Sequence, residues 1–234
     1  MSAMHRLFQL MAEKKASDIY LSVNAPINIR INGVAVPVNQ QLMTADTIRA
    51  LLYEIFTEKQ RDEFEREWEL NTAFELPEVG AYRLSAMMQR GSPAAVIRYI
   101  PMTIPALGTL GLPPILGDII MEKRGLILMV GATGTGKSTS LASMLDYRNE
   151  LKSGHILTIE DPVEFIFKNK KSIVNQREVG RDTHQFQTAL KNALRQAPDC
   201  ILIGEVRDQE TMTAAIQYAQ TGHLCLATMH ANNS

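Results

Sequence analysis

The chain of 234 residues is long enough for one large domain or two modest ones. Its 45% hydrophobic and 21% charged residues are typical of a folded globular protein, and its formal net charge of −1 gives no general reason to expect nucleic acid as a partner. Cys200 and Cys225 stand inside apolar runs, so we expect small buried side chains in a reducing compartment rather than a disulfide. We see no secretory leader and no apolar run long enough to span a bilayer, and we expect a cytoplasmic chain with no transmembrane segment.

Residues 1–100 are predicted to form an α+β domain. Asn32-Gly33 is a strong hairpin signal between two short apolar runs, and Thr57-Glu58-Lys59-Gln60 fits a capping box that starts a helix. The predicted elements, in chain order, are a helix over 4–11, strands over 19–22, 27–31 and 34–36, helices over 44–56 and 58–68, and strands over 81–89 and 94–100.

Prolines and glycines crowd residues 101–114, which we expect to be an interdomain linker. From residue 115 to 234 apolar strands alternate with helices, which indicates a parallel α/β sheet. The predicted strands are 126–130, 156–160, 200–203 and 224–229, and the predicted helices are 137–151, 183–194 and 208–221. Since no helix follows the last strand to cover the sheet, we expect the α/β domain to be incomplete at its C-terminus.

One segment matches the phosphate-binding loop pattern G-x-x-x-x-G-K-[ST], namely Gly131-Ala132-Thr133-Gly134-Thr135-Gly136-Lys137-Ser138. A predicted strand precedes it, and a predicted helix continues from Thr139. Glycines let backbone N–H groups surround phosphates, Lys137 can reach the β- and γ-phosphates, and the Ser138 hydroxyl can bind Mg²⁺. The alternative is a glycine-rich turn with a chance lysine. We expect residues 131–139 to bind the phosphates of a nucleotide.

Two acidic sets follow predicted strands. Glu205 ends an apolar strand and is a candidate Mg²⁺-side acid, and a carboxylate of Glu160-Asp161-Pro162-Val163-Glu164 could orient or deprotonate the attacking water. The alternatives are an incidental acid at a strand end and a solvated acidic turn.

Two histidines flank the last predicted strand. His223 begins it and His230 ends it, so either imidazole could lie by the γ-phosphate. The alternative for both is a structural role, which we assign to His5, His155 and His184.

These segments together resemble a known superfamily. Residues 131–138, 156–164, 203–207 and 221–230 look like the Walker A, Asp, Walker B and His boxes of type II/IV secretion and type IV pilus ATPases. Asn175-Gln176-Arg177-Glu178-Val179-Gly180 is similar to the pilus-retraction branch, the PilT and PilU group. Residues 121–125, 194–199 and 224–233 look closer to PilU. The resemblance covers essentially the whole chain, including Ala16-Ser17-Asp18-Ile19.

The resemblance implies a RecA-like P-loop ATPase core preceded by a PAS-like domain, with ATP and Mg²⁺ as ligands. It implies that Glu164 is the catalytic base, that Glu205 lies on the Mg²⁺ side, and that Arg83 and Arg98 reach a nucleotide within a hexamer. From the residues alone, we favour solvated charges on strand faces for both arginines, and only the resemblance favours a role at the nucleotide. Arg195 and Arg207 are weaker candidates, because either could merely neutralise nearby acids.

The resemblance further implies an ATP-hydrolysing motor subunit that drives type IV pilus retraction and twitching motility. Its implied partners are further copies of itself, a PilT-like ATPase and an inner-membrane platform protein, so the protein would be cytoplasmic and peripheral to that membrane. The alternatives are a PilT-dependent accessory subunit and a secretion or pilus-assembly ATPase. The family's C-terminal helical region would lie beyond Ser234.

Overall fold

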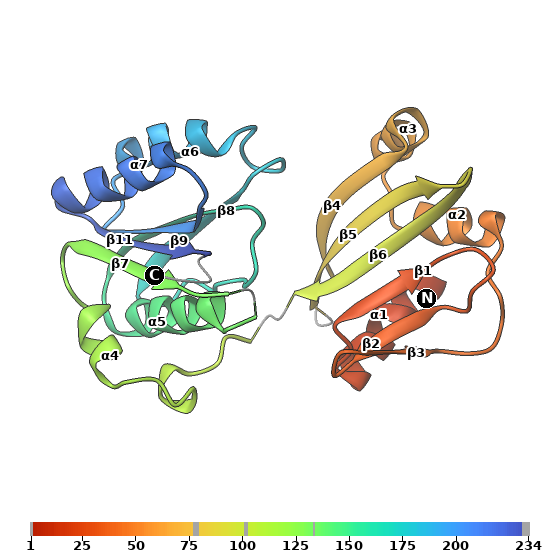
Figure 1. Cartoon of the computed structure of the whole chain (residues 1–234), viewed down its shortest axis with the longest axis horizontal. Coiled ribbons are helices and arrows are strands. Elements are labelled where there is room, and N and C mark those ends of the chain that lie inside the picture. Colours follow the sequence, from red (N-terminus) through yellow and green to blue (C-terminus); the bar gives the residue numbers. More distant parts are fainter. Residues whose placement is uncertain (1, 77–79, 101–102, 133, 231–234) are drawn as a thin grey trace. The chain divides into compact units, whose positions relative to one another are not determined.

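The computed structural model describes residues 2–76, 80–100, 103–132 and 134–230 (Figure 1). The chain divides into two compact units, Met1–Pro101 and Met102–Ser234. Each unit has its own sheet and its own hydrophobic core.

The first unit is built on an antiparallel sheet. Its described strands follow the order β3-β2-β1-β6-β5-β4. Their bounds are β1 (Asp18–Leu21), β2 (Asn28–Ile31), β3 (Val34–Pro37), β4 (Glu69–Leu76), β5 (Gly80–Gln89) and β6 (Ser92–Ile100), and the helices are α1 (Ala3–Lys14), α2 (Ala45–Tyr53) and α3 (Glu58–Glu67). Phe8 of α1 packs on Tyr82 of β5 with 4.4 Å between ring centroids, so the buried face of the sheet meets the helices.

Local sequence signals explain two features of this unit. Asn32 and Gly33 both have positive φ angles, 50° and 83°, as a two-residue hairpin between β2 and β3 requires. The Thr57 hydroxyl accepts from the Gln60 N–H at 3.3 Å, and Gln60 Oε1 accepts from the Thr57 N–H at 2.9 Å. Both the hairpin and the capping box are therefore confirmed.

The second unit is a parallel sheet with helices on both faces. Its described strands follow the order β7-β11-β10-β8-β9. Their bounds are β7 (Gly125–Val130), β8 (Gly154–Glu160), β9 (Ser172–Glu178), β10 (Cys200–Val206) and β11 (Leu224–Met229). The helices are α4 (Ile115–Ile119), α5 (Lys137–Leu151), α6 (Phe186–Ala193) and α7 (Gln209–Gln220), with 3-10 turns η1 (Leu107–Thr109) and η2 (Leu194–Gln196). In Figure 1, α4 and α5 cover one face, and α6 and α7 cover the other.

The segment predicted as a linker has structure of its own. Residues 101 and 102 lie outside the described residues, but 103–114 belong to the second unit and contain η1. Leu107 packs against the core cluster under α5. Most of the segment therefore packs with the α/β unit.

Both cysteines are buried, as expected from their apolar surroundings. Cys200 and Cys225 lie on the adjacent central strands β10 and β11. Burial raises the pKa of the Cys200 thiol to about 12 and also raises the pKa of Cys225. Both thiols therefore stay protonated and pack as small apolar groups.

Candidate active site

The carboxyl ends of four parallel strands meet at one edge of the second sheet. A cavity of about 360 Å³ opens there. It is lined by residues in and after the C-terminal halves of β8, β10 and β11 and by residues after β7, an arrangement typical of ligand sites in parallel sheets. The lining residues include Gly134, Gly136, Lys137, Ser138, Thr139, Leu141, Ala142, Glu160, Asp161, Glu164, Phe165, Phe167, Leu202, Glu205, Thr228 and His230.

The loop after β7 leads directly into α5. Gly134 and Gly136 have φ angles of 81° and 87°, which side chains with a Cβ rarely adopt, and Gly136 is the N-cap of α5. The Lys137 ammonium donates to the carbonyls of Gly131 at 2.9 Å and Ala132 at 2.8 Å.

The rest of the loop also faces the cavity or supports it. The Thr135 hydroxyl donates to the Ala132 carbonyl at 2.8 Å, and Ser138 and Thr139 line the cavity from the first turn of α5. Thr133, also predicted to bind phosphate, lies outside the described residues. The helix therefore begins where a bound anion would meet its free N–H groups.

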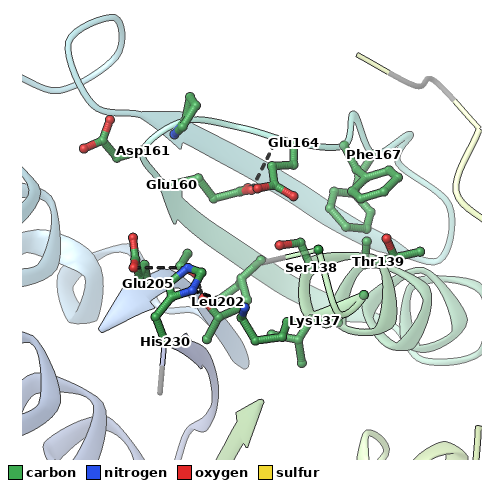
Figure 2. Close-up of a pocket in the computed structure, with 18 residues that line it drawn as sticks. Lys137, Ser138, Thr139, Glu160, Asp161, Glu164, Phe167, Leu202, Glu205 and His230 are labelled. Atoms are coloured by element: carbon green, nitrogen blue, oxygen red, sulfur yellow. Dashed lines mark hydrogen bonds and ion pairs between the residues drawn. The ribbon is translucent and has the colours of Figure 1, made fainter. Parts of the chain in front are cut away.

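Polar and charged side chains at the ends of three strands form a line of contacts beside the loop. His230 Nδ1 lies 3.4 Å from Lys137 Nζ, and His230 Nε2 lies 3.3 Å from Glu205 Oε1 (Figure 2). Arg207 extends this line of contacts, because its Nε lies 2.7 Å from Glu205 Oε2 and its Nη1 lies 3.0 Å from Asp161 Oδ2. Glu205 is thus held between a histidine and an arginine at the cavity wall.

Glu160 and Glu164 occupy the opposite side of the cavity from Lys137 in Figure 2. Glu164 is exposed, whereas Glu160 is only 7% exposed. Glu160 Oε1 accepts from the Thr158 hydroxyl at 2.6 Å, and Glu160 Oε2 accepts from the Glu164 N–H at 3.4 Å. Burial raises the pKa of Glu160 to about 7, against the lowering effect of these hydrogen bonds.

The two predicted histidines lie at opposite edges of the sheet. His230 follows β11 and lines the cavity. His223 precedes β11, where its carbonyl accepts from the Gly125 N–H at the start of β7 and its Nδ1 lies 3.1 Å from the Thr221 hydroxyl. All of β11 separates His223 from the cavity, roughly 20 Å at 3.3 Å per strand residue. The expectation that either imidazole could lie by the γ-phosphate is therefore wrong for His223.

Arg83 and Arg98 lie in the first unit, directly opposite each other on β5 and β6. Arg98 Nε is 2.9 Å from Oδ1 of Asp18, which is 2% exposed, while the Arg98 side chain is 60% exposed. Arg30 also approaches Asp18, at 3.8 Å. The sequence segment Ala16-Ser17-Asp18-Ile19 thus supplies a buried carboxylate that orients an exposed arginine.

Several lining residues were not among the predicted ones. Thr228, Phe165, Phe167 and Leu202 form part of the wall, and Glu160 was considered only as one member of an acidic set. The signal for Thr228 was present, because it lies near the end of the strand that His230 directly follows. Arg195 lies in η2, away from the cavity lining.

The side chains at the cavity suit a magnesium–nucleotide pair. Among the described residues, no group of three or more His, Cys, Asp or Glu side chains gathers as a metal cage. Mg²⁺ usually binds through one or two protein oxygens together with phosphates, and the Ser138 hydroxyl and the Glu205 carboxylate both line this cavity. These two residues fit that pattern.

The fold and the site define a P-loop nucleotide-binding protein of the α/β class. The chain belongs to the family described as Type II/IV secretion system protein, which matches residues 2–234. Among the described residues, no helix is both long and apolar enough to cross a membrane.

Comparison with known proteins points to pilus and secretion ATPases. The chain is 48% identical over 229 residues to the type IV pilus ATPase PilU of Pseudomonas aeruginosa, covering 98% of this chain and 60% of PilU. It is 44% identical over 228 residues to the retraction ATPase PilT of the same organism, covering 97% of this chain and 66% of PilT. The chain therefore spans less than two thirds of the length of either relative.

Solved structures share the fold over nearly the whole chain. The crystal structure of the pilus retraction motor PilT with bound ADP superposes with a TM-score of 0.92 at 44% identity, covering 100% of this chain and 68% of that one. The ATPase DotB of Legionella pneumophila gives a TM-score of 0.83 at 30% identity, covering 98% of this chain and 66% of that one. The fold is therefore an ATPase fold of this family, with an antiparallel first unit and a parallel second unit.

Proposed function

We propose that the protein binds ATP with Mg²⁺ in the cavity at Lys137, hydrolyses it, and acts as a motor subunit in type IV pilus retraction. The observation that carries this proposal is the convergence of Lys137, Glu205, His230 and Glu164 on one cavity from four different strand ends. The likeness to PilU and PilT supports pilus retraction as the biological setting.

Each side chain has a role that fits its position. The N–H groups of residues 131–139 and the Lys137 ammonium bind the phosphates. Ser138 and Glu205 would hold Mg²⁺, which would supply positive charge to the phosphates. Glu164, exposed at the cavity, accepts a proton from the attacking water, and His230 donates a hydrogen bond near the γ-phosphate. Catalysis is then mainly positioning and charge stabilisation.

The first unit completes the site in an assembly. Arg98, oriented by Asp18, and Arg83 beside it supply positive charge to a nucleotide within a hexamer of this chain or with a PilT-like subunit. An arginine acting on the transferred phosphoryl group is worth about 10³–10⁵ in rate. In this proposal the protein acts in the cytoplasm, in contact with an inner-membrane platform protein.

A second role is favoured by the 48% identity with PilU. In that role the protein is an accessory ATPase that acts together with a PilT-like motor. Stimulation of the turnover of a PilT-like protein by this one, without comparable turnover alone, distinguishes it from an independent motor. A secretion or pilus-assembly ATPase is a third reading that the family permits.

The proposal is tested by titrating wild-type protein and Lys137→Ala with ATP and Mg²⁺ while measuring phosphate release. We expect Lys137→Ala to lose at least about tenfold in ATP affinity and nearly all turnover, since it removes the charge at the β- and γ-phosphates. Lys191→Ala, which removes an exposed lysine of α6, is the matched control. Equal binding and turnover in wild type and Lys137→Ala would show that this cavity is not the nucleotide site.

A further inference from the structure

The loop that carries Glu164 lies between β8 and β9 and is held by side chains of β9. In the structure, residues 161–167 form no helix or strand of their own. Buried backbone N–H groups outside regular structure need other partners. The partners here come from Gln176 and Glu178, two members of the segment Asn175–Gly180.

Gln176 binds the loop at two points. Its Oε1 accepts from the Phe167 N–H at 2.8 Å, and its Nε2 donates to the Phe165 carbonyl at 2.8 Å. The side-chain amide therefore pairs with the loop as a neighbouring strand would, one donor and one acceptor on the same side. Phe165 and Phe167 both line the cavity, so this pairing fixes its apolar wall.

Glu178 binds the same loop nearer its start. Its Oε2 accepts from the Val163 N–H at 2.9 Å, one residue before Glu164. Glu178 is itself 9% exposed, and its own N–H donates to Asp182 Oδ2 at 2.9 Å. The acceptor is thus a carboxylate fixed in place by the turn that follows β9.

The loop is also fastened to β8. Glu160 Oε2 accepts from the Glu164 N–H at 3.4 Å, and Glu160 Oε1 accepts from Gln176 Nε2 at 3.4 Å. Glu160 and Gln176 therefore belong to one network. The N–H groups of Val163, Glu164 and Phe167 are all taken by side chains, while the Glu164 carboxylate remains at the cavity.

We propose that Gln176 and Glu178 are positioning residues that hold residues 161–167 so that the Glu164 carboxylate faces the bound nucleotide. The inference rests on the proposed function, in which Glu164 is the base. It assigns a role to Gln176 and Glu178, two residues of the segment Asn175–Gly180 that take no part in the proposed reaction itself.

The expected effect is a loss of rate rather than of binding. Neither Gln176 nor Glu178 lines the cavity, so the phosphate contacts remain in their absence. Misplacing a catalytic group by about 1 Å can cost about 10²-fold in rate. We expect Gln176→Leu to lower kcat about 10- to 100-fold and to change the KM for ATP less than about threefold.

Amide hydrogen exchange measures the positioning directly. In Gln176→Leu the Phe167 amide loses its acceptor, and we expect its exchange to accelerate at least about tenfold. The matched control is Asn175→Ala on the same strand, because Asn175 Oδ1 contacts His155 Nε2 at 2.9 Å rather than the loop. The control is expected to keep both the exchange rate of Phe167 and the wild-type kcat.

A second pair of variants covers the case in which Gln176→Leu fails to fold. Glu178→Gln keeps an oxygen acceptor for the Val163 N–H, whereas Glu178→Ala removes it. We expect Glu178→Gln to restore most of the rate that Glu178→Ala loses, and the Val163 amide to exchange faster only in Glu178→Ala.

The two proposals fail in different ways. Wild-type exchange at Phe167 in Gln176→Leu, or at Val163 in Glu178→Ala, overturns the positioning role whatever the rate. The positioning role is also overturned if these amides exchange faster in the variants while kcat equals that of wild type and Glu164→Gln is inactive. Wild-type turnover by Glu164→Gln would instead show that Glu164 is not the base, and it would contradict that part of the proposed function.

Discussion

His230 Nε2 lies 3.3 Å from Glu205 Oε1, and the other nitrogen of the same ring lies 3.4 Å from Lys137 Nζ. One imidazole therefore connects the acid at the end of β10 with the lysine at the start of α5. The imidazole therefore contacts two residues that lie far before it in the chain, Glu205 and Lys137, and it lines the cavity.

We expect His230→Ala to lower kcat about 10- to 100-fold while ATP affinity changes less than about threefold, because general acid–base or hydrogen-bonding groups act mainly in the transition state. Steady-state ATP hydrolysis measures this. His184→Ala, which removes an exposed imidazole elsewhere in the same unit, is the control. An equal fall in both variants would contradict a specific role for His230.

Ser138→Ala should raise the Mg²⁺ concentration needed for half-maximal turnover about tenfold, because it removes one of the two expected protein oxygens. A magnesium titration at saturating ATP measures the change. Ser140→Ala is the matched control, since its hydroxyl donates to the Gly136 carbonyl at 2.9 Å within the helix. An unchanged magnesium requirement in Ser138→Ala would exclude the hydroxyl as a ligand.

The buried Glu160 makes stability depend on pH. Its pKa is about 7 in the folded chain and 4.5 ordinarily, so the folded state binds the proton more tightly. The contribution of Glu160 to stability therefore falls by about 3 kcal/mol as pH rises from about 4.5 to 7, and this contribution is constant outside that window. Glu160→Gln removes this titration.

Urea unfolding of wild type and Glu160→Gln at pH 4.5, 6 and 8 measures the effect. The free energy of unfolding of the variant relative to wild type should increase by about 3 kcal/mol between pH 4.5 and 8. A difference that stays the same at all three pH values would show that Glu160 does not titrate in this window.

Arg98→Ala should lower turnover of the assembled protein at least about 10³-fold, because it removes positive charge from the transferred phosphoryl group. Since its partner Asp18 is buried, the variant should also be less stable than wild type, and the free energy of unfolding is measured on the same samples. Arg30→Ala is the matched control, since Arg30 also approaches Asp18. Turnover is measured at a protein concentration at which the assembly persists. Equal turnover in both variants would assign Arg98 to the surface rather than to the nucleotide.

The sequence predicted the parts of the site that depend on short-range pattern. These parts carry a signal that can be recognised from neighbouring residues alone. They are the loop at 131–138, the helix after it, and strands β7, β8, β10 and β11. Strands β4 and β9 were missed. Both strands lie at the edges of their sheets. In both, polar or charged residues interrupt the apolar ones, so neither strand shows a long apolar run.

The missed site residues depend on long-range placement. The pairing of Gln176 with Phe165 and Phe167 exists only because β9 lies beside β8, which the spacing in the sequence does not reveal. The position of His223, in contrast, could have been predicted from the sequence, because the predicted sheet is parallel and the direction of its last strand follows from that. In a parallel sheet the residue before a strand lies at the edge opposite to the residue after it, so His223 and His230 could not both reach the cavity.

We propose that Glu164, held at this cavity, acts as the base in ATP hydrolysis. The most direct test is single-turnover hydrolysis of Mg²⁺–ATP by wild type and Glu164→Gln, with ATP affinity measured on the same samples. We expect Glu164→Gln to bind ATP within about threefold of wild type and to hydrolyse it at least about 10²-fold more slowly. A wild-type rate of hydrolysis in Glu164→Gln would show that Glu164 is not the base.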